Sequence, residues 1–156
     1  MAEPITHYMA SDHEELDALG ERFQVALEQG TAAAAELFEE FRQRFLHHVG
    51  MEEELLFPAF EAKHGPGRAG PTALLRQDHQ KARALLREVK DRLQRGAPAA
   101  ETLRTFEQLT AFVHQHNLRE EAVLYPATDR LHGAEEASQL LQAMQARRIE
   151  EDDLEE

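Results

Sequence analysis

The stretch His48–Pro58 reads HVGMEEELLFP, and the same pattern returns at His116–Pro126, which reads HNLREEAVLYP. Each stretch places a histidine four residues before a glutamate and ends in a proline. The two pairs are His48 with Glu52 and His116 with Glu120. Residues four apart lie one turn apart on the same face of an α-helix. The stretches therefore predict two helices that each present an imidazole and a carboxylate in one direction, as a metal site requires.

These stretches belong to a longer internal repeat. SDHEELDALGERF from Ser11 resembles QDHQKARALLREV from Gln77, and FEEFRQRFLHHVGMEEELLFPA from Phe38 resembles FEQLTAFVHQHNLREEAVLYPA from Phe106. Each half predicts one helical hairpin, which cannot bury its apolar face alone, whereas two hairpins can close a bundle. We therefore expect an all-α fold: an up-down-up-down four-helix bundle with an internal two-fold repeat and a short C-terminal fifth helix.

Apolar residues recur at steps of three and four through most of the chain, which is typical of amphipathic helices. The predicted helices are Pro4–Gln29, Thr31–Lys63, Pro71–Gly96, Ala99–Leu131 and Ala134–Arg148. A capping box at Ser11 offers another start for the first helix, but the apolar stripe continues before it. Pro58 is expected to kink or interrupt the second helix. We expect one domain, residues 1–148, followed by a disordered acidic tail, residues 149–156.

Composition narrows the possible partners. The chain has 156 residues, no cysteine and a formal net charge of −13. The absence of cysteine excludes disulfides and thiolate metal ligands. The negative charge disfavours nucleic acid and anionic membranes as partners, and no apolar run is long enough to span a membrane. We expect a cytoplasmic protein without a nucleic-acid or membrane partner.

The first and third predicted helices also place a histidine on their inner stripes, at His13 and His79. Singly, each histidine is more commonly a hydrogen-bonded core residue than a ligand. Together, four imidazoles and two carboxylates buried without a partner would cost several kcal/mol, and a pair of metal ions would offset that cost. The expected metal ligands are His13, His48, Glu52, His79, His116 and Glu120. Nitrogen and oxygen ligands without sulfur suit iron, with zinc or manganese as alternatives.

This pattern resembles the hemerythrin-like (HHE cation-binding) family, over roughly residues 5 to 132. The marks are the single histidines of the first and third helices, the His-x-x-x-Glu pairs, and the endings Glu-Glu-x-x-Leu-Phe/Tyr-Pro. The resemblance implies two iron ions bridged by two carboxylates and by an exogenous oxygen. It assigns His13 and His48 to one iron, His79 and His116 to the other, and Glu52 and Glu120 to the bridges.

The sequence departs from the oxygen-carrying hemerythrins, which hold one iron with three histidines, two of them a turn apart on the third helix. Here Leu75 and Arg83 stand one turn either side of His79. We infer a more symmetric site with an open position on each metal. This favours catalysis, peroxide reactivity, sensing or plain metal binding over reversible oxygen carriage. A further ligand from His7, Tyr8 or Glu53 stays open.

The expected function is that of a non-haem di-iron protein binding a small ligand such as dioxygen, nitric oxide or peroxide, for sensing, storage or the response to iron or redox stress. Two alternatives stay open. One is a di-iron enzyme that consumes peroxide or oxidises ferrous iron, and the other is a redox-silent, zinc-stabilised interaction module. Whether the protein is an enzyme is left undecided by the sequence.

The side chains around the predicted ligands have simpler expected roles. His47 and His114 lie beside ligand positions but off the inner stripe, and Glu53 and Glu121 are expected to face solvent. His64 and His132 precede glycines at helix ends, where the helix dipole favours cations. Phe57 and Tyr125 are expected to pack over one end of the site, with the Tyr125 hydroxyl as a candidate hydrogen-bond donor to a bound ligand. The residues in this group are His47, His64, His114, His132, Glu53, Glu121, Phe57 and Tyr125.

Overall fold

The computed structural model describes residues 3–65 and 70–149, and nearly all of them are helical. The helices are α1 (Pro4–Glu28), α2 (Ala33–Met51), η1 (Glu52–Leu56), α3 (Phe57–His64), α4 (Pro71–Gln94), α5 (Ala99–Arg119), η2 (Glu120–Leu124) and α6 (Tyr125–Ala146). The predicted all-α class is confirmed. The acidic tail lies outside the described residues apart from Ile149.

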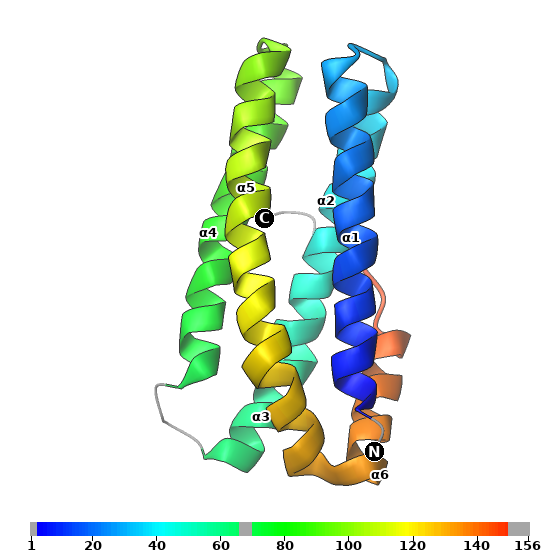
Figure 1. Ribbon diagram of the computed structural model, residues 1–156, viewed down its shortest axis with the longest axis vertical. Helices are drawn as coiled ribbons and strands as arrows, with labels where there is room; N and C mark the ends of the chain where they lie inside the picture. The colour runs from blue at the N-terminus through cyan, green and yellow to red at the C-terminus, as the bar shows by residue number, and fades with distance from the viewer. Residues whose placement is uncertain (1–2, 66–69, 150–156) are drawn as a thin grey trace.

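The helices form four long rods (Figure 1). In this view α1 rises, the continuous rod α2–η1–α3 descends, α4 rises, and the rod α5–η2–α6 descends. α1 packs along α2 and α4 packs along α5, so each half of the sequence repeat is one hairpin. Contacts of α1 with α5 and of α2 with α4 join the two hairpins. As a result, the inner face of every rod points toward the common axis of the bundle.

The end of the fourth rod folds back on the bundle at Gly133. Its backbone is non-helical, with φ 76° and ψ 171°, a conformation that glycine adopts without a steric penalty. Beyond this point the second half of α6 packs against α1 (Figure 1). The segment expected as a fifth helix from Ala134 is this second half of α6.

One widened turn interrupts the second rod and another interrupts the fourth, at η1 and η2. Each is a π-helical turn in which a backbone N–H reaches the carbonyl five residues back: Phe57 to Glu52, and Tyr125 to Glu120. A proline follows each turn, at Pro58 and at Pro126. Proline lacks an N–H and its ring clashes with the carbonyl four residues back, so it breaks regular α-helix. The wider turn accommodates that break, and the chain continues as a helix instead of stopping at Pro58.

Apolar side chains form a core on each side of the π-helical turns. One cluster lies toward the hairpin turns and includes Phe23 and Phe106, whose rings meet edge-on with centroids 4.8 Å apart. The other lies toward α3 and α6 and includes Ile5, Leu56 and Met144. Both clusters consist of buried apolar side chains, so the polar layer between them is held in place by apolar burial on either side.

The N-terminus of α1 is capped from the opposite end of the chain. The buried Asp129 carboxylate accepts hydrogen bonds from the backbone N–H of Ile5 at 3.1 Å and of Thr6 at 2.9 Å, and from the Thr6 hydroxyl at 2.7 Å. Asp129→Ala is expected to lower the free energy of unfolding by about 1–3 kcal/mol, because the buried donors lose their acceptor. Urea denaturation of the metal-loaded protein measures this loss. Asp153→Ala, in the acidic tail, is the matched control, and an equal effect of the two substitutions would contradict this role.

Candidate metal centre

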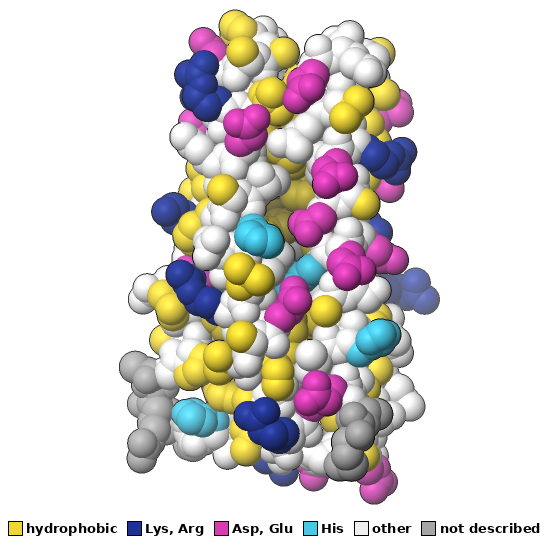
Figure 2. Space-filling model, in the orientation of Figure 1, with side chains coloured by type: hydrophobic (Ala, Val, Ile, Leu, Met, Phe, Trp, Pro, Cys, Tyr) yellow, Lys and Arg dark blue, Asp and Glu magenta, His cyan; other side chains and the backbone are white. Residues whose placement is uncertain are grey.

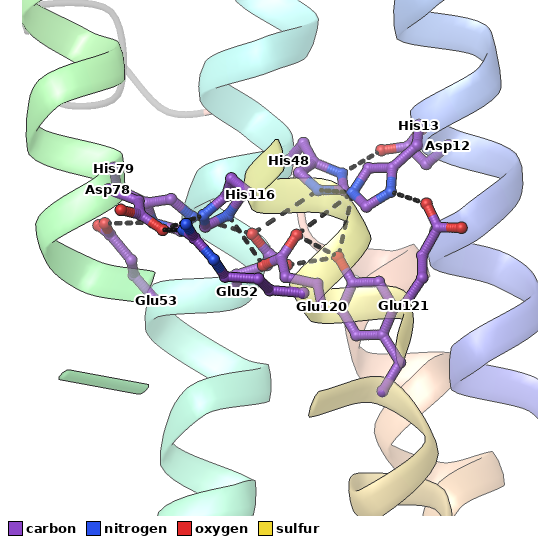
Figure 3. Close-up of polar contacts among 12 residues, drawn as sticks. Asp12, His13, His48, Glu52, Glu53, Asp78, His79, His116, Glu120 and Glu121 are labelled. Atoms are coloured by element: carbon purple, nitrogen blue, oxygen red, sulfur yellow. Dashed lines mark hydrogen bonds and ion pairs between the residues drawn. The ribbon is translucent and has the colours of Figure 1, made fainter. Parts of the chain in front are cut away.

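The fold brings all six predicted ligand side chains together in the polar layer (Figure 3). His13 comes from α1, His48 from α2, His79 from α4 and His116 from α5, while η1 and η2 supply Glu52 and Glu120. Each of the six is at most 5% exposed, and both glutamates are fully buried. Each π-helical turn begins at its glutamate, so the widened backbone sets the direction of both carboxylates.

The four imidazoles point their Nε2 atoms inward. His13 Nε2 lies 3.1 Å from His48 Nε2 and 3.3 Å from Glu120 Oε1. In the other half of the site, His79 Nε2 lies 3.0 Å from Glu52 Oε1. Two ligand atoms that each lie about 2.1 Å from one metal ion, at right angles, are about 3 Å apart. The observed spacings therefore match those of atoms that share a cation.

Two groups of ligand atoms can be separated within the cluster. Glu52, His79, His116 and Glu120 form one group, and His13, His48 and Glu120 form the other; within each, the ligand atoms lie within 4.8 Å of one another. Glu120 belongs to both groups, as a bridging carboxylate would.

Two atoms of this cluster are buried without a hydrogen-bond partner, namely His116 Nε2 and Glu120 Oε2, which lie 3.1 Å apart. An unpaired buried acceptor costs free energy, and a cation between the two atoms would satisfy both. The donor set of imidazole nitrogens and carboxylate oxygens is the one that iron, manganese and zinc accept. The residues present thus form a cluster able to hold a metal.

Each imidazole is oriented from behind by a second carboxylate (Figure 3). The Nδ1 atoms donate as follows: His13 to Glu121 at 2.7 Å, His48 to Asp12 at 2.6 Å, His79 to Glu53 at 2.8 Å and His116 to Asp78 at 2.9 Å. Because Nδ1 carries the donated hydrogen, the lone pair of each neutral ring is left on Nε2. Carboxylates in this position fix ring orientation and raise ligand basicity in metal sites.

The four orienting carboxylates follow the sequence repeat. Asp12 and Asp78 each precede the histidine of their own helix and bond the histidine of the neighbouring helix, His48 or His116. Likewise Glu53 and Glu121 each follow a central glutamate and bond a histidine of the opposite hairpin. Glu53 and Glu121 were expected to face solvent; instead each bonds a predicted ligand histidine, although the Glu121 side chain is also 38% exposed. The available signal was the repetition of Asp-His and Glu-Glu in both halves.

Arginines support three of these carboxylates. Arg83 bonds Glu53 at 2.7 Å, while Arg119 bonds Asp78 and Arg44 bonds Asp12, both at 3.1 Å. Burial by itself raises the pKa of Glu53, but hydrogen bonds from His79 and Arg83 outweigh burial and lower that pKa to about 2. The carboxylate behind His79 is therefore ionised at every physiological pH.

Tyr125 reaches into the centre of the cluster. Its hydroxyl oxygen lies 2.6 Å from Glu52 Oε2, 2.8 Å from Glu120 Oε1 and 3.1 Å from His13 Nε2. Burial and the two neighbouring carboxylates raise the pKa of Tyr125 well above its ordinary value, so the hydroxyl stays protonated and donates. The corresponding residue of the first half, Phe57, has no hydroxyl and stacks on His79, with ring centroids 5.3 Å apart. The two halves of the site therefore differ.

The other candidates for a further ligand lie elsewhere. His7 is exposed, Tyr8 packs against the apolar core, and Glu53 bonds the outer nitrogen of His79. Among the remaining histidines, His47 donates to the Arg147 carbonyl at 2.8 Å and His132 to the Thr128 carbonyl at 2.9 Å. The Tyr125 hydroxyl, by contrast, faces the inner side of the cluster and contacts three of the predicted ligands, Glu52, Glu120 and His13.

In the absence of a cation, protons are held on the histidines. Burial alone lowers the pKa of His13, but hydrogen bonding and attraction from Glu120 and Glu52 outweigh burial and raise it to about 9. At His79 burial is likewise outweighed by the hydrogen bonds that the ring donates to Glu52 and Glu53, and its pKa is also raised to about 9. Burial and the charge of Glu120 raise the pKa of Glu52. The cluster thus attracts positive charge.

Comparison with known proteins agrees with this geometry. The family model of the hemerythrin HHE cation binding domain matches residues 5–128. The chain belongs to this family. That match spans the first three rods and the fourth as far as Thr128, and it includes every side chain of the polar cluster described above. Searches of the curated proteins and of the solved structures give no match to this chain. The helices of the part that the structure describes include none long and apolar enough to cross a membrane.

The orienting carboxylates can be tested separately from the ligands. Asp12→Asn is expected to weaken metal binding about 10–100-fold. The amide carries no negative charge beside the His48 ring, and because it can donate as well as accept it does not fix the His48 tautomer. Competition with a chromophoric chelator measures the affinity. Asp91→Asn, on the exposed face of α4, removes the same charge and is expected to change nothing. Equal affinities of the two variants would contradict the orienting role.

Proposed function

We propose that this hemerythrin-family chain is a non-haem di-iron protein that binds a small ligand such as dioxygen, nitric oxide or peroxide, for sensing, storage or the response to iron or redox stress. In this proposal His13 and His48 hold one iron, His79 and His116 hold the other, and Glu52 and Glu120 bridge them. Bound iron would supply reversible electron transfer and a Lewis-acid position for the small ligand.

One observation carries this proposal. Four imidazoles turn their Nε2 atoms toward two fully buried carboxylates, while their Nδ1 atoms are each bonded to a separate carboxylate. A structural core histidine needs only one such partner. An arrangement that satisfies every outer nitrogen and leaves the inner atoms crowded and partly unpaired favours cations at the centre.

Two features favour small-ligand chemistry over a purely structural metal. The cluster offers fewer histidines than an oxygen carrier, and Leu75 and Arg83 occupy the positions one turn from His79. Each metal would therefore keep a coordination position for an exogenous ligand, as catalytic and sensing sites do. The Tyr125 hydroxyl, at the edge of both central carboxylates, can donate a hydrogen bond there.

The test is anaerobic loading with ferrous iron, followed by titration with nitric oxide and with dioxygen under optical and electron paramagnetic detection. The proposal predicts spectra that change stoichiometrically with each ligand. Repeated consumption of hydrogen peroxide or of added ferrous iron would favour the di-iron enzyme instead. Binding of zinc in preference to iron, with spectra indifferent to both gases, would support the zinc-stabilised module and contradict the proposal.

A further inference from the structure

A cavity of about 360 Å³ lies between α1 and α5 and ends at His13 and His48. Figure 2 shows it as a hollow between these helices, with apolar atoms at its base and acidic side chains along the side that α1 forms. Its volume equals that of about a dozen water molecules. A diatomic gas needs far less room, so the cavity is large enough for an organic molecule.

The internal repeat shows that this cavity is a feature of one half only. The related face, between α4 and α2, keeps a space of only about 10 Å³ beside His79 and His116. Buried side chains fill it: Leu86 stands where the cavity has Gly20, and the buried Leu46 stands where it has the exposed His114. Arg83 replaces Asp17 and is held against Glu53. The two halves of the metal site have the same ligand types but differ in access. The His13–His48 half opens into the large cavity, and the His79–His116 half is closed by side chains.

The inner part of the cavity holds an unpaired polar group. Asn117 is only 8% exposed, lines both the large and the small space, and forms no side-chain hydrogen bond with any residue that the structure describes. Its counterpart in the first half is the apolar Val49. The amide is therefore free to hydrogen-bond whatever occupies the cavity, so this position favours a ligand with a hydrogen-bonding group at its inner end.

The mouth of the cavity is acidic, and its walls combine apolar side chains with the polar Gln24, Thr110 and His114. Asp17 and Glu21 lie one turn apart on α1 at the exposed end, and the described lining residues include neither lysine nor arginine. Between the mouth and Asn117 the walls include Leu16, Phe45 and Leu109. The cavity thus has carboxylates at its outer end, apolar side chains in its middle and an amide at its inner end. A complementary molecule would carry a positive group, then an apolar segment, then a hydrogen-bonding group.

From these features we infer that the cavity binds a small organic cation, with its positive group between Asp17 and Glu21, its apolar body along the walls, and a hydroxyl or carbonyl group beside Asn117. The inference builds on the proposed function, because the inner end of this molecule would lie next to the His13–His48 half of the metal site. A small organic cation is therefore the class of substrate or effector that would bind beside this half.

Four probes with the same six-carbon chain test the inference by calorimetric titration of the metal-loaded protein at pH 7. They are 6-aminohexan-1-ol, hexylamine, 1,6-hexanediol and 6-hydroxyhexanoate. We expect 6-aminohexan-1-ol to bind most tightly, about five- to tenfold more tightly than the diol, because two partly exposed carboxylates attract its ammonium group. Hexylamine should be weaker than the amino alcohol, and the anionic probe should not bind.

Variants separate the contributions. Asp17→Asn with Glu21→Gln should abolish the preference for the amino alcohol over the diol, whereas Glu14→Gln with Glu28→Gln removes two charges from the same helix outside the cavity and should preserve it. Asn117→Val copies the first half of the repeat. It should make the amino alcohol bind like hexylamine while leaving the melting temperature largely unchanged, because the Asn117 amide has no hydrogen bond to a described residue to lose. A merely structural Asn117 would lower the melting temperature on substitution.

Equal affinity for all four probes, tighter binding of the anion, or no binding at all would overturn the inference. The same result follows if the preference for the amino alcohol survives loss of both Asp17 and Glu21. Metal content and the gas titrations are measured on the same samples, so the two proposals fail separately. Probe preference without a gas response contradicts only the proposed function, and a gas response without probe preference contradicts only the cation site.

Discussion

Replacing His116 with alanine is expected to empty the metal centre and to lower the melting temperature by about 10 °C. His116 Nε2 lies 3.1 Å from Glu120 Oε2, and both atoms are buried without a hydrogen-bond partner. Removing the imidazole takes away a ligand and leaves the carboxylate unsatisfied. A metal whose dissociation constant is a thousandfold below the free metal concentration stabilises a protein by about 4 kcal/mol. In a chain of this size that stabilisation raises the melting temperature by roughly 10 °C.

The measurements are metal analysis and calorimetric melting of the variant beside the wild type. His48→Ala should give the same result, since His48 occupies the related position in the other half. The wild type stripped by a chelator should melt within a few degrees of either variant, because loss of metal is the main effect. His64→Ala is the control, as His64 is exposed and, within the described part of the chain, its ring stacks on Phe60. Full metal content in His116→Ala would contradict the ligand assignment.

The metal-free and metal-loaded forms are expected to respond to pH in opposite directions. In the metal-free protein the pKa values of His13 and His79 are raised to about 9. A raised histidine pKa gives stability that is fully present below the unfolded value of about 6.5 and is lost as pH rises through 9. The melting temperature of the metal-free form should therefore fall by roughly 10–20 °C between pH 6.5 and 9.5.

The metal-loaded form reverses this trend because the metal and the proton compete for Nε2. Its melting temperature should be steady from pH 7 to 9 and should fall below pH 6, where protons displace the metal. Scanning calorimetry with and without chelator measures both curves. Metal-free His13→Gln with His79→Gln has no imidazole at these positions and should lose most of the alkaline slope. Slopes of the same sign in both forms would show that protons and metal do not share these nitrogens.

The fold class and the convergence of the six side chains were predictable from the sequence because they rest on helical periodicity. The four-residue spacing of His48 and Glu52 fixes their common face wherever the helix lies. The stripe that buries Leu16 also carries His13 inward. The repeat then indicates that two hairpins close around one site, and this information is local to each helix.

The orienting carboxylates were not predicted because their role depends on neighbouring helices. Asp12 lies one residue off the inner stripe of α1, and it reaches His48 only because α2 packs at a particular rotation and height. The π-helical turns have the same origin: Pro58 signals a break, but only packing decides between a kink and a widened turn. The one-sided cavity depends on which side chains of facing helices lie at the same level, and a single sequence does not give that register.

The most direct test of the metal centre is a crystal structure of the aerobically purified, iron-loaded protein with anomalous data collected on both sides of the iron absorption edge. Two anomalous peaks per chain are expected, one within about 2.5 Å of the Nε2 atoms of His13 and His48 and the other within that distance of the Nε2 atoms of His79 and His116. A single peak, no peak, or a metal bound away from these four nitrogens would contradict this expectation.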